Sequence, residues 1–156
     1  FNPYGAIKGA DELIEAAESA PMPIVWCRSN ATMQSTIPDV LLHHPRIVHV
    51  IDPTPEQLRF LYENCYTYLC FSRSEGFGWA IADALALSRR VASRPVGVLR
   101  LPGVRTEGVI LQESMAAPPW DQLASEDHQP TGCLQVASPD DFAIRLRQIV
   151  REGVAS

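Results

Sequence analysis

Two acidic residues, Glu75 and Asp83, lie in the stretch SRSEGFGWAIADALAL, residues 72–87. Near the first of them, Gly76 and Gly78 permit positive φ and let the backbone approach a ligand closely. The helix that follows would leave its first N–H groups, those of residues 78–81, without intrahelical acceptors, and such a helix start attracts phosphate. The stretch therefore predicts a small site in which a carboxylate binds hydroxyl groups and backbone amides bind an anion. A solvated glutamate in an ordinary glycine turn is the simpler alternative, because a G-x-G pattern alone is a weak signal.

Asp83 is the one charged residue in an otherwise apolar run, residues 77–88. At 100° per residue the apolar side chains of this run cover nearly the whole circumference of a helix, so we expect the helix to be buried and Asp83 to be at least partly buried. A buried carboxylate needs a cation or hydrogen-bond donors. An ion pair with Arg89, Arg90 or Arg94 is the interpretation that the residues alone favour. The alternative is a ligand that brings hydroxyl groups, such as a ribose diol.

Other chemistries fit the sequence less well. A dinucleotide-binding fingerprint would need a third glycine where Ile81 stands, and Lys8, the single lysine of the chain, is not in a Walker motif. No nucleophile elbow is present, and no pattern ties the histidines to a nucleophile. The cysteines have no C-x-x-C spacing, so we expect buried, reduced thiols and no zinc site. The four cysteines are Cys27, Cys65, Cys70 and Cys133.

Composition limits the classes of function further. The 156 residues carry a formal net charge of −5, which argues against a broad nucleic-acid surface. The sequence has no apolar run of roughly 18 residues that would span a bilayer, and no signal segment precedes the first predicted helix. It begins at Phe1 rather than at a methionine. We therefore expect one domain over residues 1–156, cut from a longer cytoplasmic protein.

Apolar periodicity predicts strands that alternate with helices. Helices are expected at 10–19, near 32–43 with Pro38 inside or at its start, at 54–65, at 77–88 and from Ser138 onward; strands are expected at 23–28, 46–51, 66–71, 90–93 and 132–136. Residues 97–132 are expected to form a long loop or insertion with one strand at 108–111. Thr54 and Gln57 have the spacing of a capping box, and Pro55 is expected in the first turn of the helix over 54–65.

This alternation predicts an α/β fold: a doubly wound parallel sheet with helices on both faces, of Rossmann-like type. Ligands of such folds bind beyond the carboxyl ends of the strands. The loops after residues 51, 71 and 93 are therefore the candidate sites, and the loop after residue 71 is SRSEGFG.

The order of these motifs resembles the C-terminal, donor-binding domain of group 1 glycosyltransferases, the family 4 retaining enzymes of GT-B fold. Residues 72–93, SRSEGFGWAIADALALSRRVAS, resemble the family's E-G-F-G turn and its two acidic positions in E-x7-E spacing. IKGADELIEA, residues 7–16, is similar to the family's K-G-x-x-x-L-I-x-A opening. The resemblance continues through 46–65 and 132–150, and it covers most of the chain except about 97–131.

The resemblance implies a role for each matching residue. Glu75 would bind hydroxyl groups of the transferred sugar, and Lys8 would neutralise the leaving diphosphate; these are the two expected catalytic residues. The amides of Phe77, Gly78 and Trp79 would approach the sugar and the diphosphate.

The nucleotide would be held by further residues. Asp83 would bind the ribose diol, and the loop at Ile51 and Asp52 would border the base. No metal or cofactor is expected, since Lys8 and the helix start supply the positive charge.

The resemblance also implies partners. The donor would be a nucleoside diphosphate sugar, and the sugar would pass to a glycan or glycoconjugate bound on an N-terminal acceptor domain of the same protein, in polysaccharide or glycoconjugate synthesis. The full-length enzyme would be compatible with peripheral membrane association. No nucleic-acid partner is expected.

Three departures from the family pattern support an alternative. Asn2 stands where the family has an arginine, Asp83 replaces the commoner glutamate, and residues 96–98 match the family's G-G-x-x-E turn only loosely, without its glutamate. A non-catalytic GT-B-like module with a degenerate donor site is therefore the second interpretation. An unrelated flavodoxin-like binding domain shares the alternating pattern and is the third.

Overall fold

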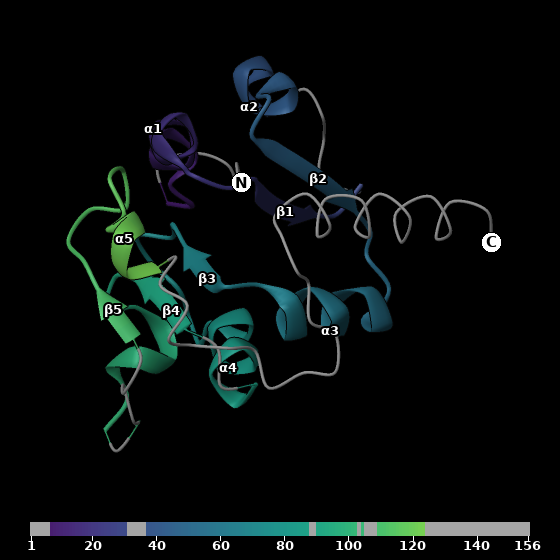
Figure 1. The fold of residues 1–156 in the computed structure, drawn as a ribbon. Coiled ribbons are helices and arrows are strands. Elements are labelled where there is room, and N and C mark those ends of the chain that lie inside the picture. Colours follow the sequence, from purple (N-terminus) through teal and green to yellow (C-terminus); the bar gives the residue numbers. More distant parts are fainter. Residues whose placement is uncertain (1–6, 31–36, 88–89, 103, 105–108, 124–156) are drawn as a thin grey trace.

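The computed structural model describes residues 7–30, 37–87, 90–102, 104 and 109–123, and it shows a mixed α/β fold with parallel strands (Figure 1). Two small sheets are present. In one, β1 (Ile24–Arg28) pairs with β2 (Ile47–Ile51), and in the other the order is β3 (Thr67–Cys70), β4 (Arg90–Ser93), β5 (Val109–Leu111). Every pairing is parallel, as the alternation predicted. Within the described residues the strands thus form two sheets rather than the single predicted one.

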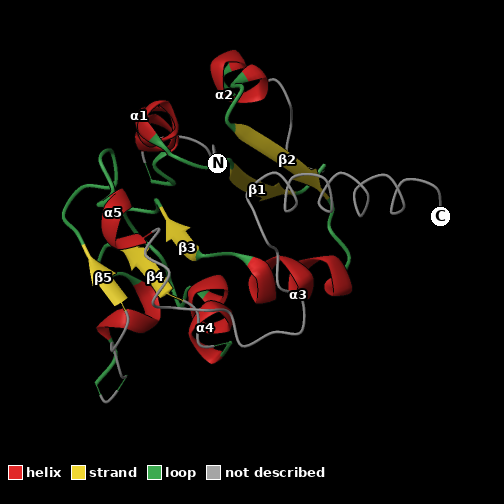
Figure 2. Ribbon diagram, in the orientation of Figure 1, coloured by secondary structure: helices red, strands yellow, loops and turns green. Residues whose placement is uncertain are grey.

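The helices fall between the strands (Figure 2). They are α1 (Ala10–Ser19), α2 (Asp39–His43), α3 (Pro55–Asn64), α4 (Trp79–Ala86), the 3-10 helix η2 (Gly97–Arg100) and α5 (Trp120–Leu123). The predictions for 10–19 and 90–93 match the observed bounds, and most others differ by one or two residues at their ends. The helix expected near 32–43 is observed only as α2, after Pro38, and residues 32–36 of that prediction lie outside the described residues. Neither η2 nor α5 was predicted, because each has only four residues and lies in the stretch 97–132, which contains several prolines and glycines and shows no helical periodicity. The strand expected at 132–136 and the helix expected from Ser138 lie outside the described residues.

The capping box of α3 is confirmed. The Gln57 amide donates to Thr54 Oγ1 at 3.2 Å, and the Thr54 amide donates to Gln57 Oε1 at 2.8 Å. Pro55 occupies the first turn, where its missing N–H has no intrahelical role. Local sequence therefore fixes where this helix begins.

Two hydrophobic clusters hold the helices against the strands. The first joins α1 and α2 to β2 and to Phe71 just beyond β3, and its fully buried members include Ala16, Leu41 and Met115. The second joins α4 and η2 to β3 and β4 through residues such as Ile81 and Val91. Truncation of a core leucine such as Leu41 costs about 2–5 kcal/mol in proteins generally.

The prediction that the helix over 77–88 is buried on all sides is wrong. Only Ile81 and Ala84 of α4 are buried, whereas Trp79, Ala80, Asp83 and Ala86 are exposed. The exposed positions form one face at helical spacing, because the second cluster covers only the opposite side of the helix. Alanines made the run look uniformly apolar, yet their small side chains do not indicate which face is covered.

The cysteine prediction holds only in part. Cys70 is buried, Cys65 is intermediate and Cys27 is exposed, and none of these three forms a disulfide. Cys133 lies outside the described residues. In the described part of the chain no helix has the length and apolar character needed to cross a membrane.

Candidate functional site

Lys8 and Glu75 form an ion pair, with Nζ and Oε1 2.5 Å apart. Lys8 precedes α1, and Glu75 lies in the loop between β3 and α4. Both side chains are partly accessible, 36% and 21% exposed respectively. The structure therefore brings together the two residues that the family resemblance made catalytic.

Backbone contacts between the two loops hold this pair in place. The Arg73 amide donates to the carbonyl of Ile7 at 2.7 Å. Gly9 has φ 68°, and a Cβ added there would lie 2.2 Å from the carbonyl oxygen of Phe71. Only glycine meets both demands, since it tolerates positive φ and has no side chain to clash. The K-G sequence thus has a structural cause: the glycine lets Lys8 approach the end of β3.

The carboxyl group of Glu75 is held in its charged form. Burial by itself would raise its pKa, but hydrogen bonds from Lys8 and Ser72, together with the Lys8 charge, outweigh that effect and lower the pKa of Glu75. Because an ammonium group carries three N–H donors and Glu75 Oε1 takes one, Lys8 retains donors for a second anion.

The start of α4 is a bare helix N-terminus beside this pair. Its N-cap residue, Gly78, has φ 79°, and no side chain caps the end. Such an end presents backbone N–H groups and the positive end of the helix dipole. The uncapped helix start that the sequence predicted is therefore present after Glu75, although the Ile81 amide, predicted to be free, donates to the carbonyl of Gly78 at 2.9 Å.

Residues 96–98, which the sequence matched only loosely to a family turn, lie directly on the Glu75 loop. The Val98 amide donates to the carbonyl of Phe77 at 2.6 Å, and Gly97 has φ 54°. A Cβ at Gly97 would come within 2.4 Å of the same carbonyl oxygen. The backbone after β4 thus fixes the turn after β3.

Two aromatic side chains stand exposed at the same turn. Phe77 is 39% and Trp79 is 73% exposed, and their ring centroids are 4.5 Å apart at 53°. Large exposed rings next to polar groups are typical of surfaces that bind a ligand with one apolar face.

Asp83 lies on the exposed face of α4, so the expectation of a buried carboxylate is wrong. The structural ion pair that the sequence favoured is not formed with Arg94, which pairs with Glu12, and Arg90 donates to the carbonyl of Gln122. Arg89 lies outside the described residues. Asp83 therefore keeps its carboxylate accessible at the surface.

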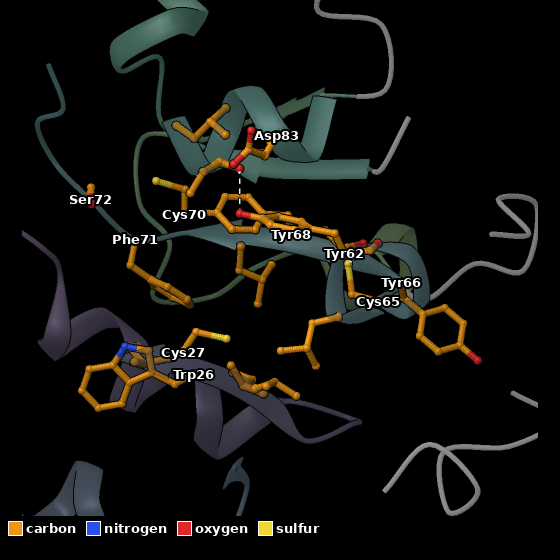
Figure 3. A pocket seen from close by; sticks show the side chains of 18 of the residues that line it. Trp26, Cys27, Tyr62, Cys65, Tyr66, Tyr68, Cys70, Phe71, Ser72 and Asp83 are labelled. Carbon is orange, nitrogen blue, oxygen red and sulfur yellow. Dashed lines mark hydrogen bonds between the residues drawn. The ribbon is translucent and has the colours of Figure 1, made fainter. Parts of the chain in front are cut away.

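Tyr62 joins α3 to α4 close to Asp83. Its hydroxyl donates to the carbonyl of Ala80 at 3.2 Å, and the Asp83 side chain lies on the same side of the cavity (Figure 3). Burial, with a smaller contribution from the Asp83 charge, raises the pKa of Tyr62 to about 12. Tyr62 is thus a neutral donor at neutral pH.

These residues border a cavity of about 840 Å³. The part of it lined by Lys8, Ser72, Glu75, Gly78, Trp79 and Asp83 is here called the mouth. The remainder, which we call the body, runs between β1 and β3 and is largely apolar (Figure 3). The mouth contains five of the predicted site residues, Lys8, Glu75, Gly78, Trp79 and Asp83, whereas Phe77 is not among the lining residues.

Ile51 and Asp52 are not among the residues that line the cavity. They lie at the carboxyl end of β2, where Asp52 adopts φ 45°. The Asp52 amide donates to the carbonyl of Arg28, and its Oδ1 accepts from the amide of Asn30, each at 2.9 Å. Asp52 therefore links the carboxyl ends of the parallel strands β1 and β2.

Arg28 is a residue that sequence reasoning missed. It lies at the carboxyl end of β1, lines the cavity and is only 8% exposed. Its Nε and Nη1 are buried without a hydrogen-bond partner. A buried cation without an anion is costly, so Arg28 is a candidate anion-binding group. Its position at a strand end, the rule that singled out residues 51, 71 and 93, is the signal that would have found it.

In the described part of the chain no cluster of three or more His, Cys, Asp or Glu side chains is arranged to hold a metal ion. Comparison with known proteins adds no assignment: no protein-family model matches this chain, and no curated protein matches it.

Proposed function

We propose that this chain is the donor-binding domain of a retaining glycosyltransferase, which binds a nucleoside diphosphate sugar. The observation that carries the proposal is the contact of Lys8 with Glu75 at the uncapped start of α4. A cation, a charged carboxylate and a helix start without a side-chain cap suit a ligand that combines a diphosphate with sugar hydroxyl groups.

In this proposal each group of the mouth has one task. Glu75 accepts hydrogen bonds from hydroxyl groups of the transferred sugar, and the Lys8 ammonium binds the diphosphate. The amides of Phe77, Gly78 and Trp79 face the sugar and the diphosphate at the start of α4. The exposed ring of Trp79 supports the assignment, since it offers an apolar face beside these polar groups.

Asp83 binds the ribose diol of the nucleotide. Its exposure on α4 supports this task, because a carboxylate that already had a buried partner would not be accessible to a ligand. The loop at Ile51 and Asp52 borders the base. Arg28 adds a second cation that lines the same cavity.

The reaction breaks the bond between the anomeric carbon of the sugar and the diphosphate oxygen, and it forms a bond from that carbon to an acceptor hydroxyl oxygen. The bonding electrons leave with the nucleoside diphosphate, and the hydroxyl proton is released to it or to solvent. Positive charge develops on the sugar and negative charge on the diphosphate. Preorganised cations and amide dipoles at the diphosphate lower the barrier to this step.

The fold that goes with this function is a doubly wound, Rossmann-like sheet. Its support is the packing: α1 and α2 share one hydrophobic cluster, and α4 belongs to another. The acceptor would be a glycan or glycoconjugate held by an N-terminal domain of the same cytoplasmic protein, which is why this chain alone is proposed to bind donor without transferring the sugar.

The second candidate is a non-catalytic module of the same fold. The close Lys8 pairing with Glu75 favours it in one respect, since an ion pair that never opens would fill the mouth with protein groups. Such a module would not bind a sugar nucleotide.

Calorimetric titration with UDP, GDP, ADP and their common sugar conjugates separates the two. We expect saturable binding of one nucleotide family, weakened by Asp83→Ala. Glu18→Ala is the matched control, because Glu18 is exposed on α1 and outside the cavity lining. Absence of binding by every nucleotide would contradict the donor-domain proposal.

A further inference from the structure

Arg28 differs from the other lysine and arginine side chains in the part of the chain that the structure describes. Its Nε and Nη1 are buried and donate no hydrogen bond, and it forms no ion pair with a described carboxylate. At 8% exposure such a cation carries a desolvation cost that the described residues do not offset. The other described cations each donate to a carboxylate or a backbone carbonyl; they are Lys8, Arg46, Arg59, Arg73, Arg90, Arg94 and Arg100.

The residues next to Arg28 do not supply a carboxylate for it. Residues 29–36, SNATMQST, contain no acidic residue. Asp52 lies beside the end of β1, but its Oδ1 accepts from the amide of Asn30 at 2.9 Å, and only its backbone amide contacts Arg28. The guanidinium group is therefore left for an anion from outside the described chain.

Arg28 is also the one charged side chain among the described residues that line the body of the cavity. The two carboxylates of the lining, Glu75 and Asp83, both belong to the mouth. An anion in the body would thus meet a positive charge in largely apolar surroundings, where a low dielectric strengthens the attraction. A mostly apolar cavity with a single placed charge is typical of a ligand site.

Arg28 lies at the end of the cavity where the mouth opens. The opposite end is at α5, because Trp120 Nε1 donates to Ser19 Oγ at the end of α1, and Thr67 Oγ1 at the start of β3 donates to the Leu123 carbonyl, each at 3.0 Å. β1 begins a few residues after Ser19 and leads away from α5, so its last residue, Arg28, lies at the far end. The loops of the mouth, before α1 and after β3, lie at this same end. A ligand that enters by the mouth can therefore reach Arg28.

We propose that the body of the cavity binds a phosphate-type oxyanion on the guanidinium group of Arg28, at a subsite separate from the Lys8 pair with Glu75. A planar guanidinium group presents a fork of N–H donors that matches phosphate oxygens bidentately. Lys8 is less suited to hold this anion, because Glu75 already neutralises its charge. The family resemblance gives Arg28 no role, and the subsite does not depend on the proposed donor function.

The unpaired charge separates a binding role of Arg28 from a structural one. Arg28→Met keeps a side chain of similar length but removes the buried charge, so the variant without ligand should have a Tm no lower than that of the original chain. Removal of an arginine that stabilised the fold would lower the Tm instead.

The test is thermal unfolding of the 156-residue chain with and without inorganic pyrophosphate, at constant ionic strength, with affinities from calorimetry. We expect pyrophosphate to raise the Tm of the original chain and to bind Arg28→Met at least tenfold more weakly. Arg59→Met removes the same charge from an exposed site on α3 and should keep the full shift in Tm. The double variant Lys8→Met, Glu75→Gln removes the pair of the mouth at constant net charge and should keep it too.

A second substitution and a second anion sharpen the test. Arg28→Lys keeps the charge but not the planar fork, so its affinity for pyrophosphate should lie between those of Arg28→Met and the original chain. Succinate, a dicarboxylate, should raise the Tm of the original chain less than pyrophosphate does.

Several results would overturn the proposal. They are no shift in the Tm of the original chain with pyrophosphate, an equal shift in Arg28→Met, a lower Tm of Arg28→Met without ligand, and loss of the shift in the double variant. An equal shift with succinate would overturn the assignment to a phosphate group.

Nucleotide titrations keep this proposal distinct from the donor function. Pyrophosphate binding through Arg28 without binding of any nucleotide would support the subsite and contradict the donor-domain proposal. Nucleotide binding without pyrophosphate binding would do the reverse. Where both bind, weaker nucleotide binding by Arg28→Met would identify the anion as a phosphate of the nucleotide, and unchanged nucleotide binding would identify it as a separate anion.

Discussion

Lys8 and Glu75 are 67 positions apart in the sequence, and their side chains meet at 2.5 Å. The contact joins the loop before α1 to the loop after β3, and it lies at the uncapped start of α4. One positive group, one negative group and a set of backbone donors thereby share the mouth of a single cavity. This is the arrangement from which the proposed donor site follows.

Loss of the Lys8 charge should weaken diphosphate recognition selectively. Lys8→Met keeps an apolar chain of similar length but removes the ammonium group, so we expect roughly tenfold weaker binding of the nucleoside diphosphate and a smaller effect on the monophosphate. Calorimetry measures both. Arg59→Gln, which removes an exposed charge on α3, is the control and should leave both affinities unchanged. Equal losses for the two nucleotides would count against the role.

Substitution of Asp83 should affect nucleotide binding without affecting stability. A hydrogen bond to a charged group contributes about 1.5–3 kcal/mol, so Asp83→Ala should weaken nucleotide binding by tenfold or more. Because Asp83 is exposed, the free energy of unfolding of the Asp83→Ala variant should differ from that of the original chain by no more than about 0.5 kcal/mol. Urea denaturation of both proteins tests the second part. A marked loss of stability would indicate a structural role instead.

Gly9 should tolerate no side chain. Its φ is 68°, and a Cβ would lie 2.2 Å from the Phe71 carbonyl, so Gly9→Ala should lower the free energy of unfolding by about 2 kcal/mol or more. Gly76→Ala provides the contrast, because nothing lies within 4 Å of a Cβ there. Chemical denaturation should show Gly76→Ala close to the original protein. Similar stabilities for the two variants would show that the K-G turn is not constrained as described.

Acid should destabilise the fold through Glu12. This buried carboxylate accepts from the Met115 amide and from Arg73 and Arg94. Burial alone would raise its pKa, but these contacts outweigh it and lower the pKa below the usual 4.5. Its contribution to stability is therefore present above about pH 4.5 and is lost as pH falls through the lowered value.

Thermal unfolding from about pH 6 to pH 3 measures this effect. Glu12→Gln should have a lower Tm at pH 6 and a weaker dependence on pH than the original chain. Glu18→Gln, on the exposed side of α1, should follow the original curve. If Glu12→Gln kept the full pH dependence, other carboxylates would be responsible for it.

Local features of the fold could be predicted from the sequence, whereas contacts between distant residues could not. The capping box of Thr54 and Gln57 lies within one turn of helix, so residues close together in the sequence specify it. The Glu12 pairing with Arg94 joins α1 to the residue after β4, and no local pattern encodes it. The sequence therefore suggested Arg94 as a partner for Asp83, whereas in the fold Arg94 pairs with Glu12 instead.

The candidate site shows the same division. The glycine turn and helix start after Glu75 were readable because they are contiguous, and only the family resemblance placed Lys8 beside them. The exposure of Asp83 was not predictable, since an alanine-rich helix does not reveal which face the sheet covers. Arg28 has an ordinary strand-end sequence, and its burial depends on packing between segments far apart in the chain.

The most direct test of the donor-site account is the contribution of the sugar to binding, measured by calorimetry. The affinity for a nucleoside diphosphate sugar is compared with that for its nucleoside diphosphate, in the original chain and in Glu75→Gln. We predict that the original chain binds the sugar conjugate more tightly, and that Glu75→Gln removes most of this difference while binding the nucleoside diphosphate nearly as before. An unchanged difference in Glu75→Gln, or no difference in the original chain, would contradict the account.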